Sequence, residues 1–397
     1  MLDKWNKSKI KYIFKERNEI VSDRDFIPLS VTKNGVTLQE NNIAYSDNHE
    51  NRKRVKKNDI ALNSRSARKG SSGNSEFDGS VSTVNNVIYT DRLLPQFANY
   101  LFKTNYFVEE YYRNGKGIHD DLWSTKFEQM GNIVIPIPSE KEQINIIERI
   151  KKLVPKIEEK IEISKRIINL SREKRRSLIH EKVTKGNNGN FELKQTDVFW
   201  VGSIPKHWNL TKIKYVANLI AKKKLTKIDD VKISAEYVVS ETGKVVNFNS
   251  EHGTEGYEFK KNDILFNKLR VYLNKVFVAD REGYSMGEMI VIRPKSIEIK
   301  YLYYVLTSHK FIDYCNSFSN GVKVPRPSID NIFDIKIPLP PKDEQNEISD
   351  ILENEISKLD SNVENHLKII ELLEEKKISI ISEEVFKNKF DLKNELH

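Results

Sequence analysis

The feature that constrains this chain most is an internal repeat. The stretch PIPSEKEQINIIERI at residues 136–150 recurs as PLPPKDEQNEISDIL at 338–352, an offset of 202 residues (344 − 142) between Glu142 and Glu344. Shorter stretches follow nearly the same spacing: KKNDIALN at 56–63 returns as KKNDILFN at 260–267, an offset of 204 (260 − 56), and WNKSKIKY at 5–12 returns as WNLTKIKY at 208–215, an offset of 203 (208 − 5). Self-similarity of this kind predicts one fold that is used twice within the 397 residues.

Each copy begins with a globular segment. Short apolar runs separated by Gly, Asn and Ser predict strands and turns through residues 26–135, with a helix over Leu94–Val108 and its counterpart over 299–312. The Lys-Asn-Asp sequence of the KKND stretch predicts a turn that leads into a strand. The residues after that strand differ, SRSARKGSSGNSE in the first copy and KLRVYLNKVF in the second. A shared scaffold with divergent loops indicates recognition of two different things.

Each copy ends with a helical segment in which apolar residues follow 4-3-4-3 spacing, over 150–178 and again over 352–380. Such heptads predict coiled-coil packing. Residues 139–190 carry 14 basic and 8 acidic residues, and residues 341–397 carry 8 and 15, so the two segments are predicted partners. The predicted interface consists of Val154, Ile157, Ile161, Ile168, Ile356, Leu359, Val363, Ile370 and Leu373. Polar side chains interrupt it at Ser164, Arg175, His366 and Lys377.

The predicted fold class is α+β, with two tandem α/β domains separated by long helices that pair as an antiparallel coiled coil with pseudo-two-fold symmetry. The predicted segments are 1–138, 139–190, 191–340 and 341–397. Ser139 and Glu142 have the spacing of a capping box at the first helix start, and KGNNGN at 185–190 predicts its end. Pro155 predicts a kink or a break near Leu153, because an interior proline removes one helical hydrogen bond.

Composition narrows the class of function. A net charge of +9 favours a polyanionic partner. The sequence shows no apolar run of membrane-spanning length and no signal-peptide pattern, so a cytoplasmic location is expected. Phosphate-loop, dinucleotide-binding, zinc-protease and serine-hydrolase motifs are missing from the sequence, and Cys315 is expected to be a packed side chain. We therefore expect a non-enzymatic binding component that itself holds no cofactor and no metal.

The repeated IPIPSEKEQ and IPLPPKDEQ stretches resemble the specificity subunit of type I restriction-modification systems. GSIPKHW at 202–208, KKNDILFNKLRVYLNKV at 260–276 and NGVKVPRPSIDNIFDIKIPLPPKDEQ at 320–345 strengthen the resemblance. The first copy departs from it, because it lacks GSIP before Trp5 and has GKGIHDDLWSTKFEQM where the second has GVKVPRPS.

The resemblance implies a sequence-specific subunit that binds double-stranded DNA at a bipartite target, with one target recognition domain for each half-site and the helix pair as a spacer. It also implies two methyltransferase subunits that use S-adenosylmethionine, and two motor-endonuclease subunits that use ATP and Mg. Two other functions stay open. One is a stand-alone DNA-binding protein, such as a homodimeric half-specificity protein, and the other is a nuclease with an unrecognised site.

Candidate DNA contacts are basic, amide and aromatic side chains close to the two KKND stretches and in the glycine-containing loop near residue 321. Arginine can read guanine and asparagine can read adenine through paired hydrogen bonds, whereas lysine mostly holds phosphate. Each is, taken singly, also compatible with an ordinary solvated surface charge. The candidates are Arg52, Lys53, Arg54, Lys56, Lys57, Asn63, Ser64, Arg65, Arg68 and Lys69 in the first copy, and Asn267, Lys268, Arg270, Tyr272, Lys323 and Arg326 in the second.

Overall fold

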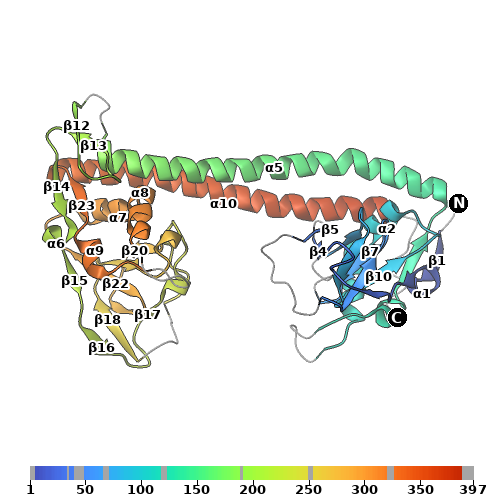
Figure 1. Cartoon of the computed structure of the whole chain (residues 1–397). Helices are drawn as coiled ribbons and strands as arrows, with labels where there is room; N and C mark the ends of the chain where they lie inside the picture. The colour runs from blue at the N-terminus through green and yellow to red at the C-terminus, as the bar shows by residue number, and fades with distance from the viewer. Residues whose placement is uncertain are drawn as a thin grey trace. The chain divides into compact units, whose positions relative to one another are not determined.

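A computed structural model describes residues 5–33, 35–39, 49–65, 71–117, 123–187, 191–248, 254–319 and 326–386. The chain forms two compact units, Met1–Lys165 with Leu367–His397 (the first unit) and Arg166–His366 (the second unit) (Figure 1). Both division points fall inside long helices, so each unit combines one globular part with a segment of each helix. The four predicted segments end near helix ends instead, and their boundaries stay predictions.

The globular part of the first unit mixes short strands and helices. Its elements are β1 (Asn6–Lys9), α1 (Ile10–Ile13), β2 (Lys15–Glu16), β3 (Ile20–Val21), β4 (Leu29–Thr32), β5 (Gly35–Leu38), β6 (Arg52–Val55), β7 (Ile60–Asn63), β8 (Ser72–Asn74), β9 (Gly79–Ser82), β10 (Asn85–Tyr89), α2 (Pro95–Leu101), α3 (Asn105–Arg113), α4 (Phe127–Met130) and β11 (Val134–Ile137). A four-stranded antiparallel sheet has the order β2-β10-β7-β8. Smaller sheets have the orders β3-β6-β9, β4-β5 and β1-β11.

Strand β7 is buried on both faces. Successive side chains of a strand point to opposite faces, and here Ile60 and Leu62 join the cluster that contains Phe97 of α2, while Ala61 joins a second cluster with Val55. The continuous apolar run IALN is explained by this two-sided burial. The strand is therefore a fixed base for the turn that follows it.

The second unit repeats this arrangement. Its elements are β12 (Leu193–Gln195), β13 (Ser203–Pro205), β14 (Asn209–Lys212), α6 (Ile213–Val216), β15 (Ala217–Ile220), β16 (Lys223–Leu225), β17 (Lys232–Ile233), η3 (Ala235–Tyr237), β18 (Glu255–Phe259), β19 (Ile264–Asn267), η4 (Val271–Leu273), β20 (Val276–Val278), β21 (Gly283–Ser285), β22 (Met289–Pro294), α7 (Ile299–Thr307), α8 (His309–Ser317), α9 (Ile329–Phe333) and β23 (Lys336–Leu339). Its main sheet, β15-β22-β19-β20, has the same strand order as the first once the repeat offset is applied. Ile264 and Phe266 of β19 enter one cluster and Leu265 enters another, as in β7.

The single helix predicted over Leu94–Val108 is wrong, because two helices, α2 and α3, lie there. Thr104 ends the first and begins the second: its hydroxyl donates to the carbonyl of Leu101 at 2.7 Å and accepts from the backbone N–H of Phe107 at 3.3 Å. Ser308 separates α7 from α8 at the corresponding place. In the first unit the capping hydroxyl of Thr104 interrupts an otherwise helical apolar pattern, whereas the Ser308 side chain makes no cap hydrogen bond.

Two long helices, α5 (Glu140–Lys185) and α10 (Lys342–Phe386), follow the globular parts. The predicted capping box is confirmed, since the Glu142 backbone N–H approaches Ser139 Oγ at 3.4 Å and the Ser139 backbone N–H donates to Glu142 Oε2 at 3.2 Å. The helix ends at Lys185, before Gly186 at φ +76°. None of the helices in the described ranges is both long and apolar enough to cross a membrane.

The predicted break near Leu153 is wrong, because α5 is one continuous helix with Pro155 inside it. Pro155 cannot donate to the carbonyl of Lys151, four residues earlier. Both residues are exposed, so water can donate a hydrogen bond to the Lys151 carbonyl on the solvent side of the helix. The proline is therefore tolerated on the outer face without ending the helix.

Within each unit the segments of α5 and α10 pack together in antiparallel order. In the first unit Arg149 Nε lies 2.5 Å from Glu384, and Lys377 Nζ lies 3.7 Å from Glu158. In the second unit Arg175 Nε lies 3.4 Å from Asp360. Rising numbers on α5 thus meet falling numbers on α10, which confirms the antiparallel coiled coil. Of the side chains predicted at its interface, five are buried and four are half-buried: Val154, Ile157, Ile161, Ile168 and Ile356 belong to the buried group, and Leu359, Val363, Ile370 and Leu373 to the half-buried group.

Candidate nucleic-acid interface

Both units contain the same tight turn at the KKND stretch. Asn58 and Asn262 adopt positive φ angles of 72° and 74°, which asparagine tolerates better than most residues. The Asp that follows closes the turn, because Asp59 Oδ2 accepts from the backbone N–H of Lys56 at 2.8 Å, and Asp263 does the same for Lys260 at 2.7 Å. The predicted turn and the strand after it are confirmed in both copies.

Each of these aspartates also holds an arginine from another strand or loop. Arg17 donates to both carboxylate oxygens of Asp59 at 2.6 and 3.0 Å, and Arg293 donates to both of Asp263 at 2.7 and 2.6 Å. These hydrogen bonds raise the pKa of both arginines. The two aspartates are buried and fully engaged, so they stabilise the scaffold and are not available to a ligand.

Asn63 and Asn267, which end β7 and β19, are occupied by the turn itself. Asn63 Oδ1 accepts from the backbone N–H of Arg65 at 3.0 Å, and Asn267 Oδ1 accepts from that of Leu269 at 3.3 Å. Asn267 is also buried and donates to the carbonyl of Leu269 at 2.7 Å. The amide of Asn267 thus faces its own turn, and contacts of Asn63 and Asn267 with DNA stay predictions.

In the first unit this turn presents Ser64 and Arg65. Ser64 is half-buried and Arg65 is exposed. The Ser64 backbone N–H donates to the carbonyl of Val84 at 3.2 Å, which ties the turn to the strand connection before β10. A cleft of about 430 Å³ lies beside it, lined in part by Arg65, Lys53 and Lys126. This cleft combines an exposed guanidinium with two amines.

The basic run, Arg52 to Lys57 without Val55, begins on strand β6. Its side chains differ in burial: Arg52 is buried, whereas Lys53 and Arg54 are half-buried. Arg52 is 5% exposed and donates to the side chain and the carbonyl of Ser80 at 2.9 and 3.0 Å, so its guanidinium is engaged within the fold, and its contact with DNA stays a prediction. Lys53 pairs with Glu16 at 3.1 Å, and Arg54 stacks over Phe26 at 3.8 Å from the ring centroid.

Lys56 and Lys57 lie outside the strand, in the turn, and are exposed. They are more exposed than Arg52, Lys53 and Arg54, and their contact with DNA stays a prediction. Arg68, Lys69 and Lys323 lie outside the described residues.

In the second unit the turn after β19 is shaped by two left-handed residues. Arg270 has φ +50° and Asn274 has φ +47°, on either side of the short helix η4. Asn274 is held by a 2.7 Å hydrogen bond to the carbonyl of Thr307. Arg270 and Tyr272 are exposed, the latter at 51%. An arginine and an aromatic ring are thus both exposed on a fixed turn. The arginine can donate hydrogen bonds to the edge of a base, and the ring can pack against a base.

Lys268 and Arg326 are held by one carboxylate. Glu288, in the turn between β21 and β22, forms an ion pair with Lys268 Nζ, and Arg326 Nη1 lies 2.8 Å from the other oxygen of Glu288. Burial acts to raise the pKa of Glu288, but the hydrogen bond from Lys268 and the nearby charges lower it overall. The structure therefore brings together two predicted DNA contacts that are 58 positions apart (326 − 268).

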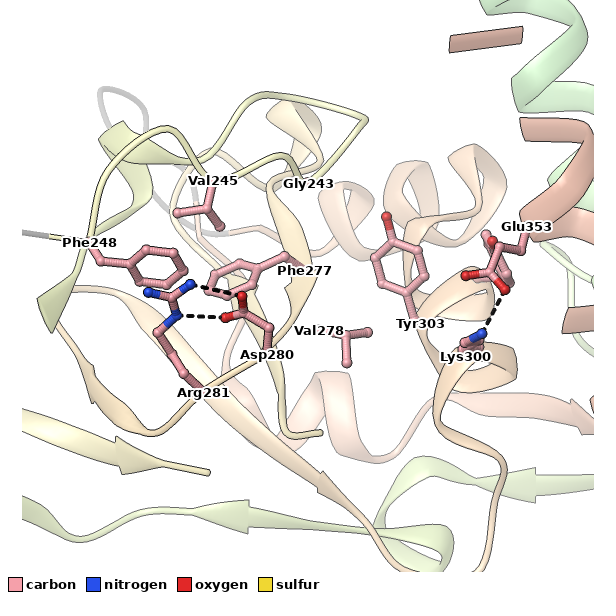
Figure 2. Close-up of a pocket in the computed structure, with 11 residues that line it drawn as sticks. Gly243, Val245, Phe248, Phe277, Val278, Asp280, Arg281, Lys300, Tyr303 and Glu353 are labelled. Atoms are coloured by element: carbon pink, nitrogen blue, oxygen red, sulfur yellow. Dashed lines mark hydrogen bonds and ion pairs between the residues drawn. The ribbon is translucent and has the colours of Figure 1, made fainter. Parts of the chain in front are cut away.

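A cavity of about 500 Å³ also lies in the second unit, next to α10 (Figure 2). Arg281 donates to both oxygens of neighbouring Asp280 at 2.8 and 2.9 Å, and Lys300 Nζ lies 2.6 Å from Glu353 on the opposite side. Both cations that line this cavity are thus neutralised within its wall. We assign no ligand to it.

The described ranges contain no group of three or more His, Cys, Asp and Glu side chains placed to hold a metal ion. Cys315 is buried in the core of the second unit, as predicted, and burial raises the pKa of its thiol. His180 and His309 form an edge-to-face pair at 5.5 Å, and burial lowers the pKa of both, to about 4 for His180. These groups belong to the packing at the end of α5.

The repeated Glu-Gln pair proves to be a clamp between each long helix and its globular part. The indole N–H of Trp5 donates to Glu142 at 2.9 Å, and that of Trp208 donates to Glu344 at 2.9 Å. The Gln that follows accepts from the first turn of α2 or α7: Gln143 from Leu94 at 2.7 Å and Gln345 from Glu298 at 2.8 Å. The repeated WN sequence could have revealed the tryptophan contact.

A second repeated surface feature was not predicted. Tyr12 and Tyr215 correspond in the repeat and are 65% and 64% exposed, each with the preceding lysine near its ring. Folding does not account for two equivalent tyrosines that both face solvent. The repeated KIKY sequence at 9–12 and 212–215 could have revealed this pair of tyrosines.

Comparisons with known proteins agree with this duplicated architecture. Residues 205–375 match the family described as type I restriction modification DNA specificity domain. The type I restriction enzyme EcoDI specificity subunit from Escherichia coli is 24% identical over 274 residues, which cover 64% of this chain and 61% of that protein. The chain thus spans less than two thirds of that relative's length.

A solved structure shares the fold over nearly the whole chain. It is described as "Structural basis underlying complex assembly and conformational transition of the type I R-M system", and the matching chain aligns with 96% of this one and 97% of its own length at a TM-score of 0.68 and 13% identity. The HsdS subunit from Thermoanaerobacter tengcongensis aligns over 97% of both chains at 14% identity and a TM-score of 0.46. Residues 205–375 are thus similar to a type I restriction modification DNA specificity domain, and the chain as a whole shares its fold with a chain from a type I R-M system.

Proposed function

We propose that this chain is the sequence-specific DNA-binding subunit of a type I restriction-modification complex and that each unit reads one half of a bipartite target. The observation that carries this proposal is the turn after β7 and β19. The two units share the strand order beneath it and the KKND turn before it, yet the side chains it exposes differ. Two equal scaffolds with unequal recognition turns suit an asymmetric target with two half-sites.

Arg65 and Arg270 are the side chains we assign to base reading. Both are exposed, and both extend from turns fixed by an asparagine at the end of a buried strand. An arginine that donates two hydrogen bonds to guanine contributes about 1–3 kcal/mol of discrimination against another base. Lys56 and Lys57 are exposed on the KKND turn at the other end of β7, and we assign them to phosphate contacts, which carry no sequence information.

The α5 and α10 pair is assigned as the spacer between half-sites and as the scaffold for partner subunits. One relative is the specificity subunit of a type I restriction enzyme, and the matching solved structure concerns complex assembly of a type I R-M system. By this likeness we propose two methyltransferase subunits and two motor-endonuclease subunits as partners. S-adenosylmethionine, ATP and Mg would then be bound by those partners, and the reaction would take place in them.

The spacer assignment is tested by deleting one heptad from each helix, residues 157–163 and 359–365, which correspond in the repeat. Because a helix rises 1.5 Å per residue, the pair becomes shorter by about 10 Å, equivalent to roughly 3 bp of DNA. Sequencing of methylated adenines in cells that carry the chain with its methyltransferase should show a bipartite motif with a shorter gap. Replacing the same heptads by others that keep the interface residues is the control, and it should leave the gap unchanged.

A bipartite motif whose gap stays the same after the deletion would contradict the spacer role. A single undivided motif in the unmodified chain would contradict the assignment of one half-site to each unit. The two outcomes separate the role of the helices from the role of the globular parts.

A further inference from the structure

We infer that Glu288 is a built-in competitor of DNA phosphate: it occupies Lys268 and Arg326 in the DNA-free protein and thereby weakens binding to non-cognate DNA. This inference rests on the proposed DNA-binding function and adds a specificity-determining residue to it. It concerns three side chains that converge from separate parts of the second unit, the turn after β19, the turn before β22 and the segment before α9.

The geometry shows one anion shared by two cations. Lys268 Nζ contacts Glu288 Oε2, and Arg326 Nη1 lies 2.8 Å from Glu288 Oε1, so both carboxylate oxygens are engaged. The side chains are 17%, 31% and 55% exposed for Lys268, Glu288 and Arg326, which leaves the cluster open to an incoming ligand. Lys223 adds a further positive charge close to Glu288. The cluster is thus positive overall and partly neutralised from within.

The first unit shows that folding does not need these charges. The Lys268 backbone N–H donates to the carbonyl of Glu288 at 3.2 Å, and the Ser64 N–H donates to that of Val84 at the same distance, with both partners offset by 204 residues. Ser124, three residues before α4, takes the position that Arg326 has three residues before α9.

Ser, Val and Ser therefore build the same turn in the first unit that Lys, Glu and Arg build in the second. Since the backbone arrangement forms without the charges, the charges serve interactions with a partner. A carboxylate within a DNA-facing surface repels phosphate. We therefore assign it a role in discrimination between cognate and non-cognate DNA.

Non-cognate binding consists almost entirely of contacts between cations and phosphates. A lysine and an arginine that are paired with Glu288 must leave it before they can replace a phosphate counterion. Loose, sequence-independent complexes gain little else to offset that loss, whereas a cognate complex also gains base contacts. Glu288 should therefore reduce non-cognate affinity more than cognate affinity.

The test measures binding of the full-length chain to a fluorescent random-sequence duplex by anisotropy, between about 50 and 200 mM salt. Glu288→Gln keeps the shape of the side chain and removes its charge. We expect an affinity increase of about 3- to 10-fold and a salt slope steeper by up to about 2, because two phosphate contacts are released. Glu258→Gln is the matched control: Glu258 pairs with Lys224 at 2.6 Å elsewhere in the same unit, and its loss changes net charge equally.

A second set of variants separates charge release from misfolding. In the Glu288→Gln background, Lys268→Met with Arg326→Met should abolish the gain in non-cognate affinity, because the two cations that the substitution releases are then absent. Equal effects of Glu288→Gln and Glu258→Gln, or weaker binding by Glu288→Gln, would overturn the inference. Failure of the unmodified chain to bind the duplex even at low salt would overturn the proposed function and the inference with it.

Discussion

The turn after β7 and the turn after β19 share a backbone hydrogen bond and differ in almost every exposed side chain around it. The residues that hold each scaffold are repeated: Asp59 and Asp263 close the preceding turn, and Asn63 and Asn267 begin the next one. At solvent-facing positions the repeat fails, as where Lys268 replaces Ser64. At these two turns the repeated Asp and Asn side chains hold the fold, and the divergent side chains are the candidates for recognition.

The largest expected effect concerns the two equivalent aspartates. Asp59→Ala and Asp263→Ala each remove a buried carboxylate, which leaves an arginine and a backbone N–H without their partner, and should lower the free energy of unfolding of the affected unit by about 3 kcal/mol. Hydrogen exchange, followed by mass spectrometry of peptides from β7 and β19, resolves the two units. Asp→Asn variants serve as controls, since the amide oxygen can still accept from the turn.

Faster exchange confined to the mutated unit is the expected pattern. An equal increase in exchange in both units after either change would show that the two scaffolds are not independent. It would contradict the comparison between the two turns.

The second largest expected effect concerns two equivalent ion pairs between α5 and α10, one in each unit. Arg175 and Lys377 correspond in the repeat, as do their partners Asp360 and Glu158, so one ion pair occurs in each unit with the helices exchanged. Arg175 is 5% exposed, whereas the Lys377 side chain is 23% exposed. Arg175→Ala should therefore cost about 2–3 kcal/mol, because Asp360 is left half-buried and unpaired, and Lys377→Ala about 0.5 kcal/mol.

Thermal unfolding and exchange along α5 and α10 would measure both changes. A larger loss for Lys377→Ala than for Arg175→Ala would contradict the assignment of the buried pair as the stronger one.

A smaller effect depends on pH and should appear in one unit alone. The pKa of His180 in the folded state, about 4, lies below its ordinary value of 6.5, with burial and the charges of His309, Lys310 and Lys185 as the causes. The unfolded chain therefore binds more protons below pH 6.5, so this contribution to stability is complete above pH 6.5 and is lost as the pH falls toward about 4. Ser382 takes the corresponding position in the first unit, where it accepts from the N–H of Asn105 at 3.2 Å.

Exchange rates in the second unit should rise between pH 7 and 5 beyond the ordinary pH dependence, and His180→Ser should remove the excess. An equal rise in the first unit, corrected in the same way, would exclude His180 as its source.

Much of the scaffold could be predicted because its signals are local. The KKND turn, the Ser139 cap and the heptads of α5 and α10 each depend on residues a few positions apart. The environment of a side chain that depends on a tertiary neighbour could not be predicted in this way. Arg52 reads as a surface cation until Ser80 of the adjacent strand accepts its hydrogen bonds.

Glu288 illustrates the same limit at the proposed interface. Its partners Lys268 and Arg326 were predicted as DNA contacts from their chemistry, but the carboxylate that joins them lies in a turn with no motif. Only the folded chain brings the three together. Ser64 and Val84, at the corresponding positions of the first unit, make the same backbone hydrogen bond without charged side chains. The fold therefore does not require the charged cluster.

The measurement that tests the central claim most directly is the methylated-adenine motif in cells that carry the methyltransferase with the unmodified chain, with Arg65→Ala or with Arg270→Ala. Each substitution should remove about 1–3 kcal/mol of base discrimination. The account predicts that Arg65→Ala relaxes the motif in one half-site and Arg270→Ala relaxes it in the other. Relaxation of both half-sites by either single change would contradict the claim that each unit reads its own half.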